Sequence, residues 1–262
     1  MARRGFTLIE LLIVVSVIGL LTAMLLPALG MVKAAANRAK CGSNMRNIAV
    51  AVIAYRNDNN DAFPGRFSDL ITSYTLPPKV LICPADVSKG TNPNMGRLTN
   101  TFWGDYSCLW TNQVSNTFMP TGTAPSQVTA ISYDYECSST LDPTGVLVTQ
   151  DDIDYFYQDY KGTPTPFPEI GTVSWAQCKL HQTQFGNLLT GNGNTTVYGA
   201  PFPPGNVPMI RCYDHWAWSN SNDPTQLATI HKVINISMEG NLLFSSPFWE
   251  IDVNPLIPLP SD

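Results

Sequence analysis

Two hydrophobic patterns follow one another in the first sixty residues. Residues 11–32 are 22 positions without a charged side chain, which as a helix would be about 33 Å long, enough to cross a hydrocarbon core of about 30 Å. Beyond Lys33, apolar residues recur at spacings of 4, 3, 4 and 3, which predicts one buried helix face. These residues are Cys41, Met45, Ile48, Val52 and Tyr55. We expect one helix from near Phe6 to about Arg56.

The remainder of the chain has a different pattern. The Asn- and Asp-rich run 57–61 is predicted to end the helix, because these side chains favour turns. Twenty of the 21 prolines lie at or after Pro64, which argues against long helices. Strands are expected at residues 131–135, 145–149, 195–198, 232–238 and 241–245, with a turn at Glu239-Gly240 between the last two. The predicted fold class is α+β, with a long helix on a β-rich, Pro-rich and loop-rich body.

Charge is distributed unevenly between these two parts. Up to Arg56 there are seven Lys and Arg against one acid, Glu10, whereas the rest has eight Lys and Arg against 19 acids. An acidic body lacks the cationic face that phosphates need, so we expect no nucleic-acid partner. Basic residues flank the apolar run, and Arg3 and Arg4 precede it. The positive-inside rule therefore predicts a membrane helix with its N-terminus in the cytoplasm.

A secretory signal peptide, cleaved near Ala34-Ala35-Ala36, and an ordinary signal anchor are the simpler explanations of such a segment. The apolar run is longer than a usual signal-peptide core. It also carries Glu10, and a carboxylate within a membrane helix costs at least about 2.5 kcal/mol, which implies a function or a partner.

Residues 3–12, Arg-Arg-Gly-Phe-Thr-Leu-Ile-Glu-Leu-Leu, resemble the prepilin signature of type IV pilins and type II secretion pseudopilins. The resemblance implies cleavage after Gly5 by a prepilin peptidase and methylation of the new N-terminus at Phe6. It also implies that Glu10 pairs with the terminal ammonium of a neighbouring subunit, since each buried charge would be costly alone. Pro27 would loosen or kink the helix, because proline interrupts the backbone ladder.

The same resemblance predicts how the chain is organised and where it goes. It implies a leader at 1–5, a transmembrane assembly helix at 6–32, an amphipathic half at 33–57 and an extracytoplasmic body at 58–262. The expected function is a structural, non-enzymatic subunit, placed in the inner membrane with its body in the periplasm and then in a pseudopilus or cell-surface filament. Expected partners are other pilin subunits, the prepilin peptidase and an inner-membrane platform. The alternative is a pilin-anchored binding module that contacts carbohydrate or a surface.

Parts of the body are similar to the pseudopilin-like group abundant in Planctomycetes, Verrucomicrobia and Lentisphaerae. The resembling segments are residues 41–45, Tyr55, Phe63-Pro64 and 81–86. That group often ends with a His, an Asn-apolar-apolar stretch and Asp-Gly-His. Here His181 is followed by residues 187–194, in which Asn192 and Asn194 replace the Asp and the His. The resemblance still implies a Gly turn between two strands.

Six cysteines in an exported body predict disulfides, although 15 connectivities are possible. Cys41 with Cys83 is the candidate pair, because both belong to the segments that resemble this group, and the bond would tie stalk to body. A second possibility is a zinc site. Two Cys-x-x-His pairs, Cys178 with His181 and Cys212 with His215, could together supply tetrahedral Cys₂His₂ ligation.

Calcium is the other cofactor that the composition suggests. An acidic cluster formed by Asp151, Asp152, Asp154 and Asp159 offers the oxygen ligands that calcium prefers. The run 57–61 lacks the Gly and the distal Glu of an EF-hand loop. The sequence requires no cofactor for the expected function.

Overall fold

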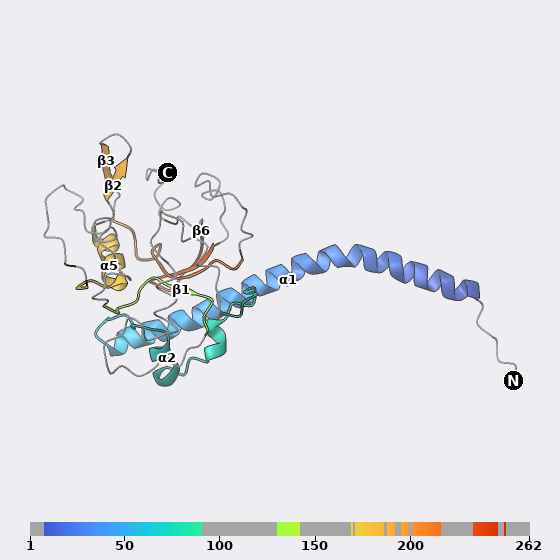
Figure 1. Cartoon of the computed structure of the whole chain (residues 1–262), viewed down its shortest axis with the longest axis horizontal. Helices are drawn as coiled ribbons and strands as arrows, with labels where there is room; N and C mark the ends of the chain where they lie inside the picture. Colours follow the sequence, from blue (N-terminus) through green and yellow to red (C-terminus); the bar gives the residue numbers. More distant parts are fainter. Residues whose placement is uncertain are drawn as a thin grey trace.

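The computed structural model describes residues 8–90, 130–141, 169, 171–185, 188–191, 195–198, 201–215, 233–245 and 249. Its dominant element is helix α1 (Leu8–Asp58), whose 51 residues are about 76 Å long. Figure 1 shows that this helix extends far beyond the body, with its N-terminal end farthest away. The long N-terminal helix predicted from the sequence is confirmed, and its observed end lies within two residues of the prediction.

The first half of α1 is exposed along its whole length. Every large hydrophobic residue from Leu8 to Val32 lies at the surface. By length and composition α1 could cross a membrane: the mean hydropathy of its most apolar segment is 2.6. The two hydroxyl side chains of this half bond within the helix: the Ser16 hydroxyl donates to the Ile13 carbonyl at 2.8 Å, and that of Thr22 to the Ile18 carbonyl at 2.7 Å. Such internal bonds reduce the cost of placing a hydroxyl in lipid.

Pro27 lies inside α1, and the helix continues through it without interruption. Figure 1 shows α1 gently bowed rather than sharply kinked. A proline removes one backbone hydrogen bond, yet the flanking turns retain theirs, so the helix can stay continuous.

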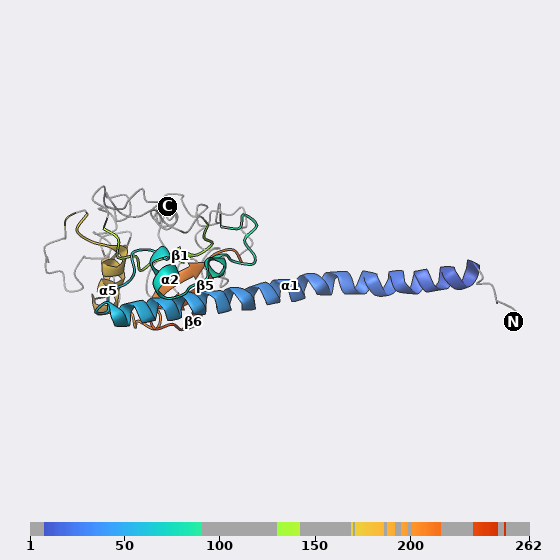
Figure 2. The same cartoon turned by 90° about the horizontal axis from the view of Figure 1, so that it is seen from below.

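The second half of α1 forms part of the body's core. Cys41, Met45, Ile48 and Val52 are completely buried, as their spacing predicted, and Tyr55 packs against the same core. In Figure 2 the body lies along this half of the helix. Helix α1 ends in the predicted run: Asn60 and Asp61 have φ of 52° and 65°, left-handed conformations that Asn and Asp tolerate and that a helix cannot continue.

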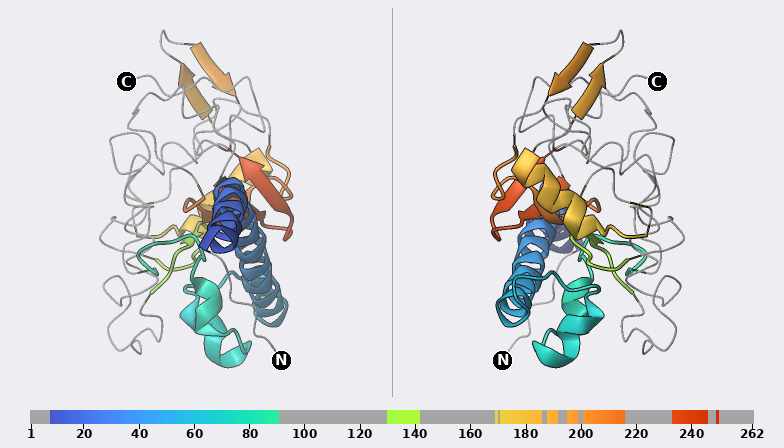
Figure 3. Two further views of the ribbon diagram at one scale, coloured as in Figure 1. Left: turned by 90° about the vertical axis from the view of Figure 1, so that its right-hand side faces the viewer. Right: turned by 90° about the vertical axis from the view of Figure 1, so that its left-hand side faces the viewer.

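A four-stranded antiparallel sheet packs beside α1. Its order is β1 (Asp134–Tyr135), β4 (Pro208–Cys212), β5 (Val233–Ser237) and β6 (Leu242–Ser245). Strands β4 and β5 are buried at every position, so both faces of the sheet are covered there. Strand β5 contacts α1, and Figure 3, which looks along the long axis, shows the sheet beside the helix. The α+β fold class is thus confirmed.

Strands β5 and β6 lie within the predicted ranges and pair through a tight turn, where Gly240 has φ of 86° and donates its N–H to the Ser237 carbonyl. Only residues 134 and 135 of the range 131–135 form a strand, because β4 pairs with just these two. The range 145–149 lies outside the described residues. Strand β4 was missed, since Pro208 at its start favours a loop.

A separate hairpin pairs β2 (Leu188–Gly191) with β3 (Thr195–Tyr198). The two strands flank residues 192–194 in the position expected for a Gly turn. Strand β3 matches its predicted range, and β2 occupies the apolar stretch that precedes the turn.

Short helices complete the described body: α2 (Ser68–Ser73), the 3₁₀ helix η1 (Pro78–Leu81) and α5 (Trp175–Phe185). Helix α5 begins with a capping box, in which the Ser174 N–H donates to Gln177 Oε1 at 2.8 Å and the Gln177 N–H donates to Ser174 Oγ at 3.4 Å. This reciprocal bonding explains why a helix starts in a Pro-rich region.

Candidate functional site

The residues of the N-terminal motif are only partly placed by the structure. Gly5 and Phe6 lie outside the described residues. Glu10 is exposed in the first turn of α1, where a negative charge is favoured by the positive end of the helix dipole. The arrangement is an apolar helix surface with a carboxylate at its far end, suited to insertion in a membrane and to packing against other helices.

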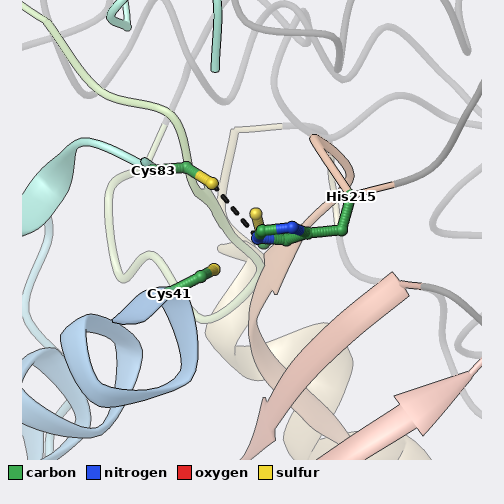
Figure 4. Close-up of side chains that lie close together, drawn as sticks. Cys41, Cys83 and His215 are labelled. Atoms are coloured by element: carbon green, nitrogen blue, oxygen red, sulfur yellow. Dashed lines mark hydrogen bonds between the residues drawn. The ribbon is translucent and has the colours of Figure 1, made fainter. Parts of the chain in front are cut away.

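A second group of residues gathers where α1 enters the body. Cys41, Cys83, Cys212 and His215 place their ligand atoms within 4.8 Å of one another. Cys83 Sγ lies 3.3 Å from His215 Nε2. The three cysteines are fully buried and His215 is partly buried. Figure 4 shows Cys41, Cys83 and His215 converging from separate parts of the chain.

Three separate segments supply the members of this cysteine–histidine cluster. Cys41 sits on the buried face of α1, where its thiol contacts Met45 Sδ at 3.7 Å. Cys83 follows η1, and its sulfur accepts the Ala85 N–H at 3.4 Å. Cys212 is the last residue of β4, and His215 follows three residues later. The cluster therefore exists only where helix, loop and sheet meet.

The three buried thiols lie close enough to change one another's pKa. Hydrogen bonds from Cys212 and then Cys41, assisted by His215, lower the pKa of the Cys83 thiol despite its burial. Burial raises the pKa of Cys212. For Cys41, the bond with Cys212 lowers the pKa, but the bond with Cys83 and burial together raise it. These neighbours thus make Cys83 easier to ionise than Cys41 or Cys212.

The loop that carries Cys83 is fixed by one buried carboxylate, that of Asp86. Its Oδ1 accepts the Ser88 N–H at 2.8 Å and the Ser88 hydroxyl at 2.7 Å. Its Oδ2 accepts the Gly90 N–H and the Ser132 hydroxyl, both at 2.6 Å. Asp86 therefore links the loop after η1 to the segment that leads into β1.

Replacing this carboxylate with an amide is expected to destabilise the body. In Asp86→Asn one acceptor oxygen becomes an NH₂ group that faces donors, so we expect a loss of about 3 kcal/mol in the free energy of unfolding. Urea unfolding of the detergent-solubilised full chain, followed by tryptophan fluorescence, measures this. The control is Asp61→Asn, because the Asp61 side chain is 79% exposed beside Arg56 and such surface pairs contribute little. Equal stability of the two variants would contradict the role given to Asp86.

The structure divides the zinc candidates predicted from sequence. Cys212 and His215 belong to the cluster, whereas Cys178 and His181 lie on α5 and contribute no ligand atom to it. The structure therefore does not group the four predicted ligands at one site. The two Cys-x-x-His pairs look equivalent in sequence, yet one spans the end of a strand and the other lies within a helix.

Cys41 and Cys83 lie together, as the sequence suggested, but as free thiols. A disulfide between them stays a prediction. Sequence reasoning missed that Cys212 and His215 join this pair, and no local pattern could have revealed it. The acidic cluster 151–159 considered for calcium lies outside the described residues.

Glu136, Lys179 and Arg211 form a buried network of ion pairs beside the sheet. Glu136 accepts Arg211 Nη1 at 3.0 Å and lies 2.8 Å from Lys179 Nζ. All three side chains are nearly inaccessible to solvent. Arg211 Nε also donates to Asn235 Oδ1 at 3.1 Å, so the network joins β4, β5, α5 and the residue that follows β1. No sequence pattern singled out these residues.

Comparison with known proteins points to one family. Residues 1–26 match the family model described as the prokaryotic N-terminal methylation motif. The chain is 32% identical over 111 residues to the type II secretion system core protein G of Pectobacterium carotovorum subsp. carotovorum, which covers 41% of this chain and 67% of that protein. No solved structure matches the chain.

Proposed function

Because the chain belongs to the family of type IV pilins and type II secretion pseudopilins, we propose that it is a structural subunit of a type II secretion pseudopilus or a type IV pilus-like filament. Members of this family serve as structural subunits. In this proposal, the subunit is held in the membrane by α1 and then polymerises through the same helix.

One observation carries the proposal: the first half of α1 exposes a predominantly apolar surface with one carboxylate, Glu10, near its far end, whereas the second half packs in the core of the body. Apolar side chains cover the helix from Leu8 to Val32. Such a surface needs lipid before assembly and other helices after it. A helix that is half membrane segment and half core supports a body that stays outside the bilayer while its stalk enters a filament.

Processing at the N-terminus belongs to the same proposal. The bond between Gly5 and Phe6 would be cut by a prepilin peptidase and the new amino group methylated, after which an inner-membrane platform would assemble the subunits. The matched motif covers both residues. Arg3 and Arg4 precede the apolar segment and support an N-terminus in the cytoplasm, with the body in the periplasm and then on the filament.

A change at the cleavage site is expected to abolish processing. In Gly5→Val, a branched side chain stands where the peptidase requires unobstructed access, so the chain should keep residues 1–5. Intact-mass measurement of the protein from membranes of cells with a prepilin peptidase reads this directly. The unchanged chain should begin at Phe6 and be heavier by one methyl group.

Gly19→Val provides the matched control. A side chain at Gly19, within α1, meets no atom within 4 Å, so the same substitution at this position should leave processing intact. Full processing of Gly5→Val, or an unchanged chain that begins at Met1 or near Asn37, would overturn the proposal.

A further inference from the structure

The cysteine–histidine cluster has the donor set and the shape of a metal site. In tetrahedral zinc centres the Zn–S distance is about 2.3 Å and the Zn–N distance about 2.0 Å, which puts neighbouring ligand atoms about 3.5 to 3.8 Å apart. The cluster's four ligand atoms lie within 4.8 Å of one another, and Cys83 Sγ is 3.3 Å from His215 Nε2. A single ion fits among them after small side-chain adjustments.

The number of sulfurs argues against a disulfide as the purpose of the cluster. Three thiols and one imidazole converge. A disulfide between any two of the cysteines would use two of the four donor groups and leave the third buried thiol and the partly buried His215 ring unused. A metal ion uses all four donors at once.

The surroundings of the cluster also suit bound thiolates. The Ala85 N–H points at Cys83 Sγ from 3.4 Å, the kind of outer hydrogen bond that orients a metal ligand. The three cysteines are inaccessible to solvent, so a bound ion would be enclosed. Asn44 packs at the same place and donates to the Ile82 carbonyl at 3.2 Å, which holds the residue preceding Cys83 against α1.

We propose that Cys41, Cys83, Cys212 and His215 bind one structural zinc ion that fastens the stalk helix to the body. Thiolate and imidazole ligands select zinc over calcium and magnesium, which require oxygen donors. Four protein ligands leave no open position for a substrate, so the site is structural rather than catalytic. The inference is independent of N-terminal processing and filament assembly.

The ligands lie far apart in sequence, which gives the ion its structural effect. It would close the chain between residues 41 and 83 and again between residues 83 and 212. Zinc binding of this kind is coupled to folding, because the unfolded chain has no preformed site. Loss of the ion should therefore loosen the docking of α1 on the sheet while leaving the membrane half of the helix unchanged.

The test uses the full chain, purified in mild detergent from membranes. Elemental analysis should find about one zinc ion per chain. Cys212→Ser and His215→Asn should each reduce zinc content at least tenfold. Cys137→Ser, a change at a buried cysteine outside the cluster, should retain the ion. Cys178→Ser should retain it also, because Cys178 contributes no ligand atom to the cluster.

A spectroscopic measurement separates metal binding from folding. Replacement of zinc by cobalt should give the intense visible bands and the thiolate charge-transfer band of a tetrahedral site, and both should disappear in Cys83→Ser. Peptide mapping under non-reducing conditions provides the opposite outcome. A Cys41–Cys83 disulfide in the unchanged chain, or free thiols that take up neither zinc nor cobalt, would overturn the proposal.

Discussion

Filaments are expected to fall by about tenfold or more when Glu10 is replaced by alanine, while cleavage after Gly5 continues. In our proposal the Glu10 carboxylate enters an apolar helix bundle together with the terminal ammonium of a neighbouring Phe6. A charge buried without its partner is strongly unfavourable. Removing the carboxylate leaves the ammonium without that partner. The growing filament then loses the contact that aligns the helix of an incoming subunit with its neighbours.

The measurement compares sheared filament fractions and intact masses from cells that make each variant. Thr22→Ala is the control. The Thr22 hydroxyl bonds to the Ile18 carbonyl of its own helix, so we expect it to make no bond to a neighbouring subunit and its loss to leave filaments unchanged. Glu10→Gln separates charge from hydrogen bonding and should behave like Glu10→Ala. Normal filament yield from Glu10→Ala would refute the ion-pair role.

The body should lose about 3 to 5 kcal/mol of stability in Glu136→Gln, because this change leaves two buried cations without their shared carboxylate. Lys179 and Arg211 both lose their ion pair with Glu136. Lys179 also lies over the Trp249 ring, 5.2 Å from the centroid, and farther from the Trp175 ring, but an aromatic ring does not replace a carboxylate. Urea unfolding of the solubilised full chain gives the difference, and a loss below about 1 kcal/mol would contradict the network's importance.

Asp134→Asn is the matched control for that experiment. Asp134 is also buried and lies opposite Arg211 in the β1–β4 register. Burial and then the neighbouring Glu136 raise its pKa, so the folded body favours the neutral acid, which asparagine imitates. We expect Asp134→Asn to be as stable as the unchanged chain at pH 7 or slightly more stable.

The two carboxyls also predict opposite dependences on pH. Burial opposes the charge of Glu136, but Lys179 and Arg211 outweigh it and lower its pKa. Its contribution to stability is therefore present above the unfolded value of about 4.3 and lost as pH falls through the lower folded pKa. Asp134 contributes stability below its unfolded value of about 3.9, which is lost as pH rises through the raised folded pKa.

Sequence predicted those parts of the fold in which one local pattern decides the outcome. The stripe from Cys41 to Val52 is buried because its spacing matches one helix face against a body. The β5–β6 hairpin formed where Gly240 could adopt positive φ. Helix α5 was not predicted, although Ser174 and Gln177 have the spacing of a capping box, a signal that could have found it.

The cluster and the ionic network could not be predicted in the same way. Cys41, Cys83 and Cys212 come from a helix, a loop and a strand, and their meeting depends on how the sheet docks on α1. Glu136 and Arg211 meet because β1 pairs with β4 in one particular register. Long-range convergence of this kind is set by tertiary packing, which local spacing does not encode.

The burial of α1 in the core has a consequence for the order of events during synthesis. A side chain at Gly42 would lie 3.5 Å from Leu242, so the helix made first is covered by a strand made among the last. Contacts of such long sequence separation form late. Helix α1 also contacts α2 and η1, which follow it directly in the chain, so its buried face is covered in part early and completely only after β5 and β6 have been made. The body therefore completes its fold only late in synthesis. By then the N-terminal half of α1 can already lie in the membrane.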